Sequence, residues 1–278
     1  MIYKYETHVH TNASSKCGKS TPEEQVQFYK ELGFTGIFIT DHFYKGNTCI
    51  DKELPWKKWV KGYCNAYKRA KKEGKKVGLQ VFFGWETSYK GEDFLIYGLD
   101  EKWLLAHPEI VDADQAEQYR LVHEAGGFVV QAHPFRERYY QTEVKLHPHH
   151  SDAWEVCNAC NNYHEDLLAY DYALAHRIPM TAGSDIHKIR STKSHCIFGI
   201  RTKKKLKSIA DYKELILSGN AELNVPDGWL NGRRNTNPFF TVNEFDEANV
   251  PHTLNPEFYE GAEKAPDPEL LRPAPKKV

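Results

Sequence analysis

The sequence predicts an α/β fold in which a mostly parallel sheet closes, or nearly closes, into a barrel. Two observations support this prediction. Short apolar runs alternate with longer helix-like segments along most of the chain, as in a parallel sheet with crossover helices. About seven such units follow one another, and that number favours a barrel over an open sheet.

The first units lie before residue 100. An apolar run at Ile2–Tyr5 predicts the first strand, and a helix is expected from Thr21 to about Leu32. Thr21 suits the helix cap, Pro22 suits the first turn, and Gly33 suits the end of this helix. The elements expected next are a strand at 35–40, a lysine-rich helix at 56–73 ended by Gly74, and strands at 77–83 and 94–97.

The remaining units complete a predicted catalytic barrel that spans residues 1–223. They are a helix at 113–125, strands at 128–132 and 153–156, a helix at 167–176, strands at 179–182 and 197–200, and a helix at 211–217. From about residue 224 no clear periodicity survives, and six prolines fall between Pro251 and Pro275. We therefore expect residues 224–278 to be an irregular C-terminal extension that wraps the barrel.

The composition is that of an ordinary globular protein, with 40% hydrophobic and 27% charged residues. The formal net charge of −1 predicts no overall attraction to nucleic acid or to acidic membranes. No run of about 18 apolar residues predicts a membrane helix, and the first residues lack the apolar run of a signal peptide. Six cysteines spread over the chain do not resemble a disulfide framework. We therefore expect a cytoplasmic protein.

The most informative histidines and acids come just after predicted strands. They are His8, His10, Asp41, His42, Glu86, His133, Asp185 and His187. Because the carboxyl ends of all parallel strands meet at one face of a barrel, these residues are expected to converge there. Each residue alone has an ordinary explanation as a helix cap, a turn or a surface acid. Their shared position after strands would then be a coincidence, which favours a common site.

The residue types suit divalent metals. Imidazole nitrogens together with carboxylates select zinc, manganese or iron over calcium or magnesium. Two histidines in the arrangement His8-x-His10 can both face one ion, and a carboxylate such as Glu86 can bridge two ions. The number of candidate ligands predicts two or three ions.

The same residues form motifs that resemble those of the PHP (polymerase and histidinol phosphatase) family, and the resemblance covers residues 1 to about 220. The motifs are His8-x-His10, Thr40-Asp41-His42, Gly84-x-Glu86, Ala132-His133-Pro134 and Gly183-Ser184-Asp185-x-His187. The resemblance implies a distorted (β/α)7 barrel of the TIM type that binds two or three metal ions. Many members of this family are phosphoesterases, and others are editing exonucleases attached to DNA polymerases.

The resemblance also implies how the ligands divide among the ions. His8, His10, Glu86 and Asp185 would surround one ion, Glu86 and His133 would hold a second, and His42 and His187 a third. This sequence departs from many relatives in two places. Where they have Asp or His five or six residues after the first motif, it has Ser15 and Lys16, with Cys17 close behind, so Cys17 or water would have to complete the third site. Where they have a second-site histidine, Asp93 stands, and we include it as a candidate ligand.

A mechanism follows from such a metal cluster. A hydroxide bridging two ions would attack phosphorus in line, because bound metals lower the pKa of water. Asp185 would take up the proton of this hydroxide. Arg136 is the first candidate for a phosphate clamp, because its planar fork matches phosphate oxygens. Arg190 and His195 follow the last metal motif and are candidates to contact phosphate or to protonate the leaving alkoxide.

The expected function is hydrolysis of a small phosphomonoester, either a nucleotide or a phosphorylated metabolite. One alternative is a nuclease or phosphodiesterase of the PHP type, which would use the basic segments Lys57–Lys76 and Arg201–Lys207 if they faced the metals. A second alternative is a non-catalytic, metal-binding regulatory domain. Amide hydrolysis is a further alternative, but it usually needs a carbamylated lysine or another histidine arrangement. No membrane partner is expected, and the oligomeric state stays open.

Overall fold

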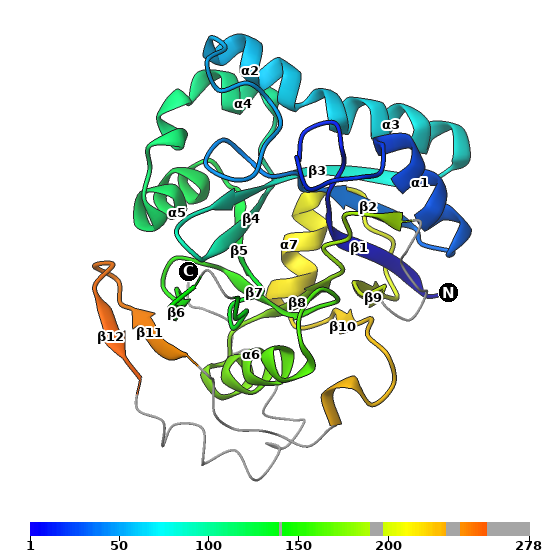
Figure 1. Ribbon diagram of the computed structural model, residues 1–278. Coiled ribbons are helices and arrows are strands. Elements are labelled where there is room, and N and C mark those ends of the chain that lie inside the picture. Colours follow the sequence, from blue (N-terminus) through cyan, green and yellow to red (C-terminus); the bar gives the residue numbers. More distant parts are fainter. Residues whose placement is uncertain (139–140, 190–196, 232–239, 255–278) are drawn as a thin grey trace.

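The computed structural model describes residues 1–138, 141–189, 197–231 and 240–254. Its main feature is a nine-stranded, barrel-shaped sheet that is nearly closed, with helices packed around it (Figure 1). The predicted α/β class and distorted barrel are therefore confirmed. Within the described residues, no helix has the length and apolar character needed to cross a membrane.

The strand order in this sheet is β10-β9-β1-β2-β3-β4-β5-β7-β8. The strands are β1 (Tyr3–Val9), β2 (Gly36–Ile39), β3 (Gln80–Ser88), β4 (Asp93–Tyr97), β5 (Phe128–Ala132), β7 (Ala153–Asn158), β8 (Met180–Gly183), β9 (Ile200–Thr202) and β10 (Glu222–Leu223). β1, β2 and β3 are parallel to one another, as are β5, β7 and β8. A parallel bridge between Val9 and Ile186 brings the β8 end of the chain against β1 and nearly completes the ring.

β4 departs from the expected parallel arrangement, since it is antiparallel to both of its neighbours, β3 and β5. Only the four residues between Ser88 and Asp93 connect β3 to β4. A connection this short can make a hairpin but cannot cross over to a parallel strand. The reversal places Asp93, the first residue of β4, at the same end of the barrel as the last residues of the parallel strands.

Seven α-helices are seen in the described residues, and most begin or end at residues that favour such positions. They are α1 (Pro22–Glu31), α2 (Trp56–Tyr63), α3 (Asn65–Val77), α4 (Glu101–Ala106), α5 (Gln115–Glu124), α6 (Tyr163–His176) and α7 (Ile209–Leu217). Thr21 caps α1 as predicted, because its hydroxyl accepts from the Glu24 amide while the Glu24 carboxylate accepts from the Thr21 amide.

The lysine-rich helix is longer than expected and is divided into α2 and α3 at Cys64. Gly74 does not end it. A Cβ at Gly74 would lie 2.6 Å from the Leu79 carbonyl oxygen, so this glycine lets the helix pack closely against the chain that enters β3. The helix ends instead at Gly78, whose φ of 71° is the left-handed conformation typical of a helix terminus.

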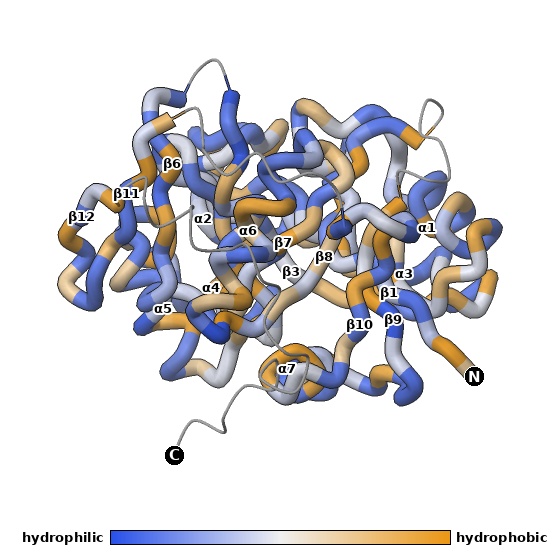
Figure 2. Tube along the Cα trace, turned by 90° about the horizontal axis from the view of Figure 1, so that it is seen from below, coloured by the Kyte–Doolittle hydropathy of each residue, from blue (hydrophilic) through white to orange (hydrophobic). Residues whose placement is uncertain are grey.

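Helix α7 closes one end of the barrel. The ring of the buried Tyr212 contacts Phe38 of β2, Tyr97 of β4 and Phe128 of β5. Figure 1 shows α7 within the ring of strands, and Figure 2 shows it at the edge of the molecule. Phe128 begins its strand, so α7 covers the amino ends of the parallel strands and leaves the opposite end for the site.

A second, smaller sheet lies beside the barrel. It consists of β6 (Glu143–Leu146), β11 (Thr241–Phe245) and β12 (Pro251–Thr253), which lie side by side in Figures 1 and 2. β11 pairs in parallel with β6, and Val242 is buried in one apolar cluster with Val144 and Leu146. We expected an irregular extension after residue 224, but residues 241–253 form two strands of this sheet.

Candidate metal centre

Strand β1 carries two histidines into the open end of the barrel. Side chains alternate along a strand, so Glu6 and His8 face the same side, and the direction continues to His10. The rings of His8 and His10 are fully buried, and their Nε2 atoms lie 3.0 Å apart. Two ring nitrogens this close in a buried space indicate that both could bind the same ion.

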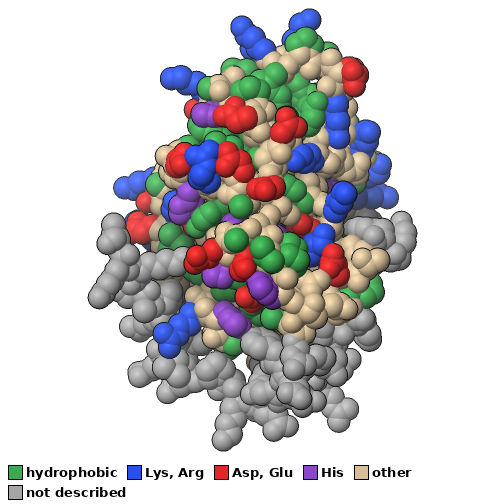
Figure 3. All heavy atoms as spheres, turned by 90° about the vertical axis from the view of Figure 1, so that its left-hand side faces the viewer, with side chains coloured by type: hydrophobic (Ala, Val, Ile, Leu, Met, Phe, Trp, Pro, Cys, Tyr) green, Lys and Arg blue, Asp and Glu red, His purple; other side chains and the backbone are tan. Residues whose placement is uncertain are grey.

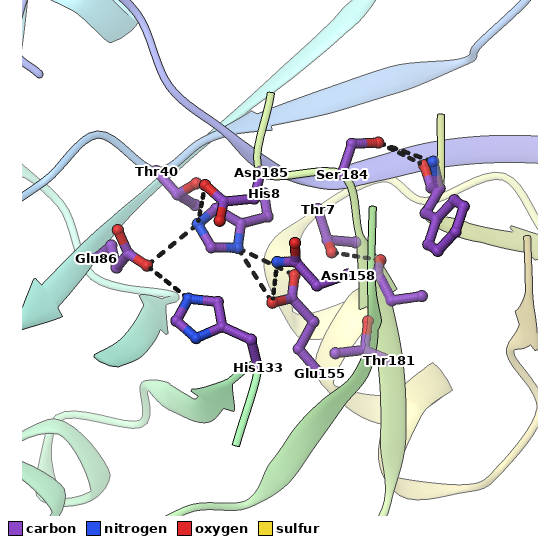
Figure 4. A network of polar contacts seen from close by, with 12 residues as sticks. Thr7, His8, Thr40, Glu86, His133, Glu155, Asn158, Thr181, Ser184 and Asp185 are labelled. Atoms are coloured by element: carbon purple, nitrogen blue, oxygen red, sulfur yellow. Dashed lines mark hydrogen bonds and ion pairs between the residues drawn. The ribbon is translucent and has the colours of Figure 1, made fainter. Parts of the chain in front are cut away.

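Glu86, near the end of β3, lies at the centre of the cluster. Its carboxylate oxygens lie 3.3 Å from His8 Nε2, 2.6 Å from His42 Nδ1 and 3.4 Å from His133 Nε2. Figure 4 shows Glu86 facing both His8 and His133. A parallel bridge between His42 and Glu86 holds the two backbones together, so these contacts are set by the sheet itself.

Two residues of the cluster have backbones in the left-handed region, which side chains other than glycine rarely adopt. They are His133, with φ of 33°, and Asp185, with φ of 55°. His133 directly follows β5, and Asp185 lies two residues after the end of β8. The unusual turns aim both side chains at His8 and His10: Asp185 Oδ1 lies 3.1 Å from His10 Nε2, and the rings of His133 and His8 are stacked. Such backbone strain is concentrated at functional sites.

These side chains form three groups that could each hold a cation. The ligand atoms within each group lie within 4.8 Å of one another. The groups are His8, His10 and Asp185; Glu86, Asp93 and His133; and His10, His42 and His187. Because Glu86 and His10 lie between groups, the three form one continuous centre.

Three histidines have one ring nitrogen fixed by an acceptor. The Nδ1 of His8 donates to Glu155 at 3.0 Å, and that of His187 donates to the Asp185 carbonyl oxygen at 2.7 Å. The Nδ1 of His10 lies 3.2 Å from the Ser15 hydroxyl, whose own proton goes to Asp41, so His10 must be the donor. In the neutral form that metal binding requires, each Nε2 then has a free lone pair, which is how metal-binding histidines are oriented.

Carboxylates outnumber the permanent cations of the centre. Among the residues that the structure describes, Glu86, Asp93, Asp185 and Glu155 face one permanent cation, Arg136, whose Nη1 lies 2.9 Å from Asp185 Oδ2. Although burial lowers the pKa of His8, the charges of Glu155, Asp185 and Glu86 hold it well above its ordinary value. The centre therefore favours positive charge.

The donor set fits divalent ions. The Glu86 carboxylate is buried, and its Oε2 lies 2.6 Å from His42 Nδ1 and 3.4 Å from His10 Nε2. A buried carboxylate is costly unless positive charge compensates it, and a cation between these groups would do so. The mixture of imidazoles and carboxylates is typical of sites for zinc, manganese or iron.

The family model described as the PHP domain matches residues 6–221, which include every residue of the three groups. The chain belongs to the PHP domain family. Sequence resemblance and structure thus agree on the family, and the centre lies where the strands of this PHP domain end.

Solved structures share the PHP fold at low sequence identity. One is a two-domain protein from Bacteroides vulgatus ATCC 8482 that contains a predicted PHP-like metal-dependent phosphoesterase, with a TM-score of 0.57 and 17% identity over 81% of this chain and 65% of that one. Another, from Bifidobacterium adolescentis ATCC 15703, is named as a candidate metal-dependent phosphoesterase. Its TM-score is 0.51, and its identity is 16% over 79% of this chain and 97% of that one. This chain thus spans less than two thirds of the two-domain protein. No curated protein sequence matches it.

The structure of this PHP domain brings together the eight side chains expected to bind metal, including Asp93, whose Oδ2 lies 3.8 Å from His133 Nε2. Arg136 also reaches the centre, where it contacts Asp185 and the side chains of Asn158 and Asn161. Arg190 and His195 lie outside the described residues.

One contributor escaped the sequence analysis. Glu155 orients His8, and the one available signal was an acid inside a short, otherwise apolar strand, β7. Ser15, which the sequence analysis had already singled out, links His10 to Asp41. Cys17, two residues later, lies on the same loop and is half-buried. Burial raises the pKa of the Cys17 thiol, but His187 and His42 lower it to about 6.

Proposed function

We propose that this PHP domain is a metal-dependent phosphoesterase that hydrolyses a small phosphomonoester, either a nucleotide or a phosphorylated metabolite. The observation that carries the proposal is Glu86, because its single buried carboxylate contacts His8, His42 and His133. One residue thereby joins the candidate ligand groups into a centre for more than one ion. Multi-ion centres are typical of enzymes that cleave phosphate esters.

The ions would be zinc, manganese or iron, held by residues already in place. His8, His10 and Asp185 would hold one ion, with Glu86 shared between it and a second ion at Asp93 and His133. His42 and His187 would contribute to a third. Divalent ions in such a centre bring the pKa of water toward neutrality and neutralise phosphoryl oxygens.

The residues around the ions would carry out the remaining steps of the reaction. Asp185 would orient the attacking water and accept its proton through Oδ1, while Arg136 holds Oδ2 at 2.9 Å. Arg136 is also our candidate for contact with the phosphate, since it is the cation next to Asp185. Arg190 and His195 remain candidates for phosphate contact or for protonation of the leaving alkoxide.

A small substrate is favoured over a nucleic acid by the position of the basic residues. The lysines of α2 and α3 lie on helices that pack against the outside of the sheet, away from the centre (Figure 1). On the face shown in Figure 3, acidic side chains are interspersed with the basic ones, and the described residues there form no continuous basic track. An extended nucleic-acid backbone needs such a track.

The test combines metal content with release of phosphate from a panel of phosphomonoesters and short oligonucleotides. We expect two or three ions per chain and monoester hydrolysis, both lost in Glu86→Gln, with activity reduced more than about 100-fold. Glu124→Gln, a change of the same kind at an exposed position of α5, is the control and should behave as wild type.

The other outcomes separate the alternatives. Cleavage of oligonucleotides without monoester hydrolysis would replace the proposal with the nuclease. Bound metal with no turnover of either substrate class would favour a regulatory metal-binding domain. Absence of bound metal after addition of manganese and zinc would contradict the proposed centre itself.

A further inference from the structure

The Arg136 guanidinium is held by three acceptors, one for each of its nitrogen atoms. Its Nη1 lies 2.9 Å from Asp185 Oδ2, its Nη2 donates to Asn158 Oδ1 at 2.8 Å, and its Nε donates to Asn161 Oδ1 at 2.7 Å. These contacts use three of the five N–H groups of a guanidinium, and the side chain is still 14% exposed. The planar group is therefore fixed in orientation while part of it stays accessible.

The amide orientation of both asparagines is set from the side opposite Arg136. The Asn158 Nδ2 donates to Glu155 Oε2 at 2.8 Å (Figure 4), and the Asn161 Nδ2 donates to Asp166 Oδ1 at 2.9 Å. A guanidinium only donates hydrogen bonds, and an ionised carboxylate only accepts them. Each asparagine therefore turns its oxygen toward Arg136 and its NH2 group toward an acid.

Asp166, in the first turn of α6, holds the parts of this network together. It is fully buried, and besides Asn161 it accepts from the Asn158 backbone amide at 3.1 Å and from the Trp229 indole at 2.8 Å. All three partners can only donate, so they favour the ionised carboxylate. Burial raises the pKa of Asp166 to about 7 although these bonds lower it, so the group is mostly ionised at pH 8.

Trp229 belongs to the chain that follows the barrel, in a short 3₁₀ helix at Trp229–Asn231. Its ring packs edge-on against Tyr163 and Phe198, with the ring centroids 5.2 Å apart in each pair. These ring contacts do not involve the indole N–H. The bond to Asp166 can therefore be removed while the ring packing is kept.

We propose that Asp166 and Trp229 are positioning residues that act through Arg136. They hold the two asparagines, and the asparagines hold the guanidinium in one orientation beside Asp185 for contact with a phosphoryl group. The chain after the barrel thereby contributes to substrate binding without touching the substrate. The inference rests on the phosphoesterase function proposed above.

The test measures binding of inorganic phosphate to the manganese-loaded protein at pH 8 by calorimetry. We expect Trp229→Phe to keep its metal content and to raise the dissociation constant of phosphate about threefold to tenfold, because a loosened guanidinium must be ordered on binding. Trp56→Phe is the matched control, since its indole donates to the Leu104 carbonyl oxygen at the same distance of 2.8 Å, on α2. It should bind phosphate as the wild type does.

A double-mutant cycle separates positioning through Arg136 from a general structural effect. In an Arg136→Met background, Trp229→Phe should change phosphate affinity by less than about twofold, because the group that it positions is gone. Asp166→Asn should weaken phosphate binding about tenfold or more in the wild-type background, since its amide places a donor against donors. An equal loss from Trp229→Phe in both backgrounds would overturn the proposal.

Failure of this inference and failure of the proposed function give different results. If the wild type binds phosphate and hydrolyses monoesters but Trp229→Phe binds phosphate equally well, the positioning role alone is refuted. If the manganese-loaded wild type neither binds phosphate nor hydrolyses monoesters, the proposed function is refuted and this inference with it.

Discussion

The histidines of the centre are oriented by acceptors that lie behind them. For His8 this acceptor is Glu155, a fully buried carboxylate that also accepts from the Asn158 side chain at 2.8 Å. An ionised carboxylate only accepts hydrogen bonds, so it fixes the proton on Nδ1 and leaves Nε2 free toward Glu86 (Figure 4). Glu155 is therefore a positioning residue whose effect is transmitted through His8.

Glu155→Gln tests this role with little change of shape. The neutral amide no longer specifies the His8 tautomer, and we expect zinc affinity to fall about 10–100-fold. Titration of the metal-free protein with zinc measures the change. Glu109→Gln, at an exposed residue, is the control, and unchanged affinity in Glu155→Gln would show that His8 needs no such orientation.

Protons compete with metal at this centre. Burial lowers the pKa of His187, but Asp185 and the neighbouring thiols raise it to about 10, so the metal-free ring carries a proton near neutral pH. In the metal-free protein this raised pKa adds stability below the ordinary pKa of about 6.5 that is lost as pH rises through about 10.

Metal ligands must lose such protons, so binding should release them and weaken as the pH falls. We expect zinc addition near neutral pH to release about one proton fewer in His187→Ala than in the wild type. Calorimetry in buffers with different ionisation enthalpies measures the number. Equal release by the two proteins would show that His187 is neutral before metal binds.

At the scale of elements, β8 passes close behind the centre at Gly183. A Cβ at this position would lie 2.3 Å from Glu155 Oε1 and 2.6 Å from the His8 Cβ. Glycine is therefore needed for β8 to approach β1, and this approach is what brings Asp185 to the histidines.

Gly183→Ala should destabilise the fold by about 1–3 kcal/mol through overpacking and should also weaken metal binding. Gly62→Ala is the matched control in helix α2, where the nearest atom to a new Cβ is Ile50 Cγ2 at 3.7 Å. That change should raise stability by up to about 1 kcal/mol, because alanine favours helix. Chemical denaturation measures both, and equal effects would contradict the close packing at Gly183.

For the whole molecule, the second sheet ties residues after 240 to the barrel. Val242 is 3% exposed and belongs to the same apolar cluster as Phe135 and Trp154. Phe135 lies two residues after His133, so this cluster supports the loop that carries a candidate ligand.

Val242→Ala should lower the free energy of unfolding by about 1–3 kcal/mol, because it leaves a cavity in this cluster. Val250→Ala, at a position that is 48% exposed, should have little effect. Thermal or chemical unfolding compares the two. Equal and small effects would mean that the second sheet does not contribute to the stability of the barrel.

Local sequence patterns were sufficient for the fold class, the family and the residues that end the strands. The spacing of apolar residues indicates where helices and strands lie. Because all parallel strands of a barrel end at one face, knowing that a residue ends a strand also tells where it lies in the fold. This is why His8, Glu86, His133 and Asp185 could be assigned to one face before the structure was known.

Only the tertiary structure decided which side chains stand behind the ligands. The bond between His8 and Glu155 spans 147 residues, and β11 pairs with β6 across about 100 residues. Such contacts depend on how whole elements pack, and periodicity within one segment carries no information about its distant partner. The reversal of β4 likewise became visible only in the structure, because it depends on how β4 pairs with β3 and β5.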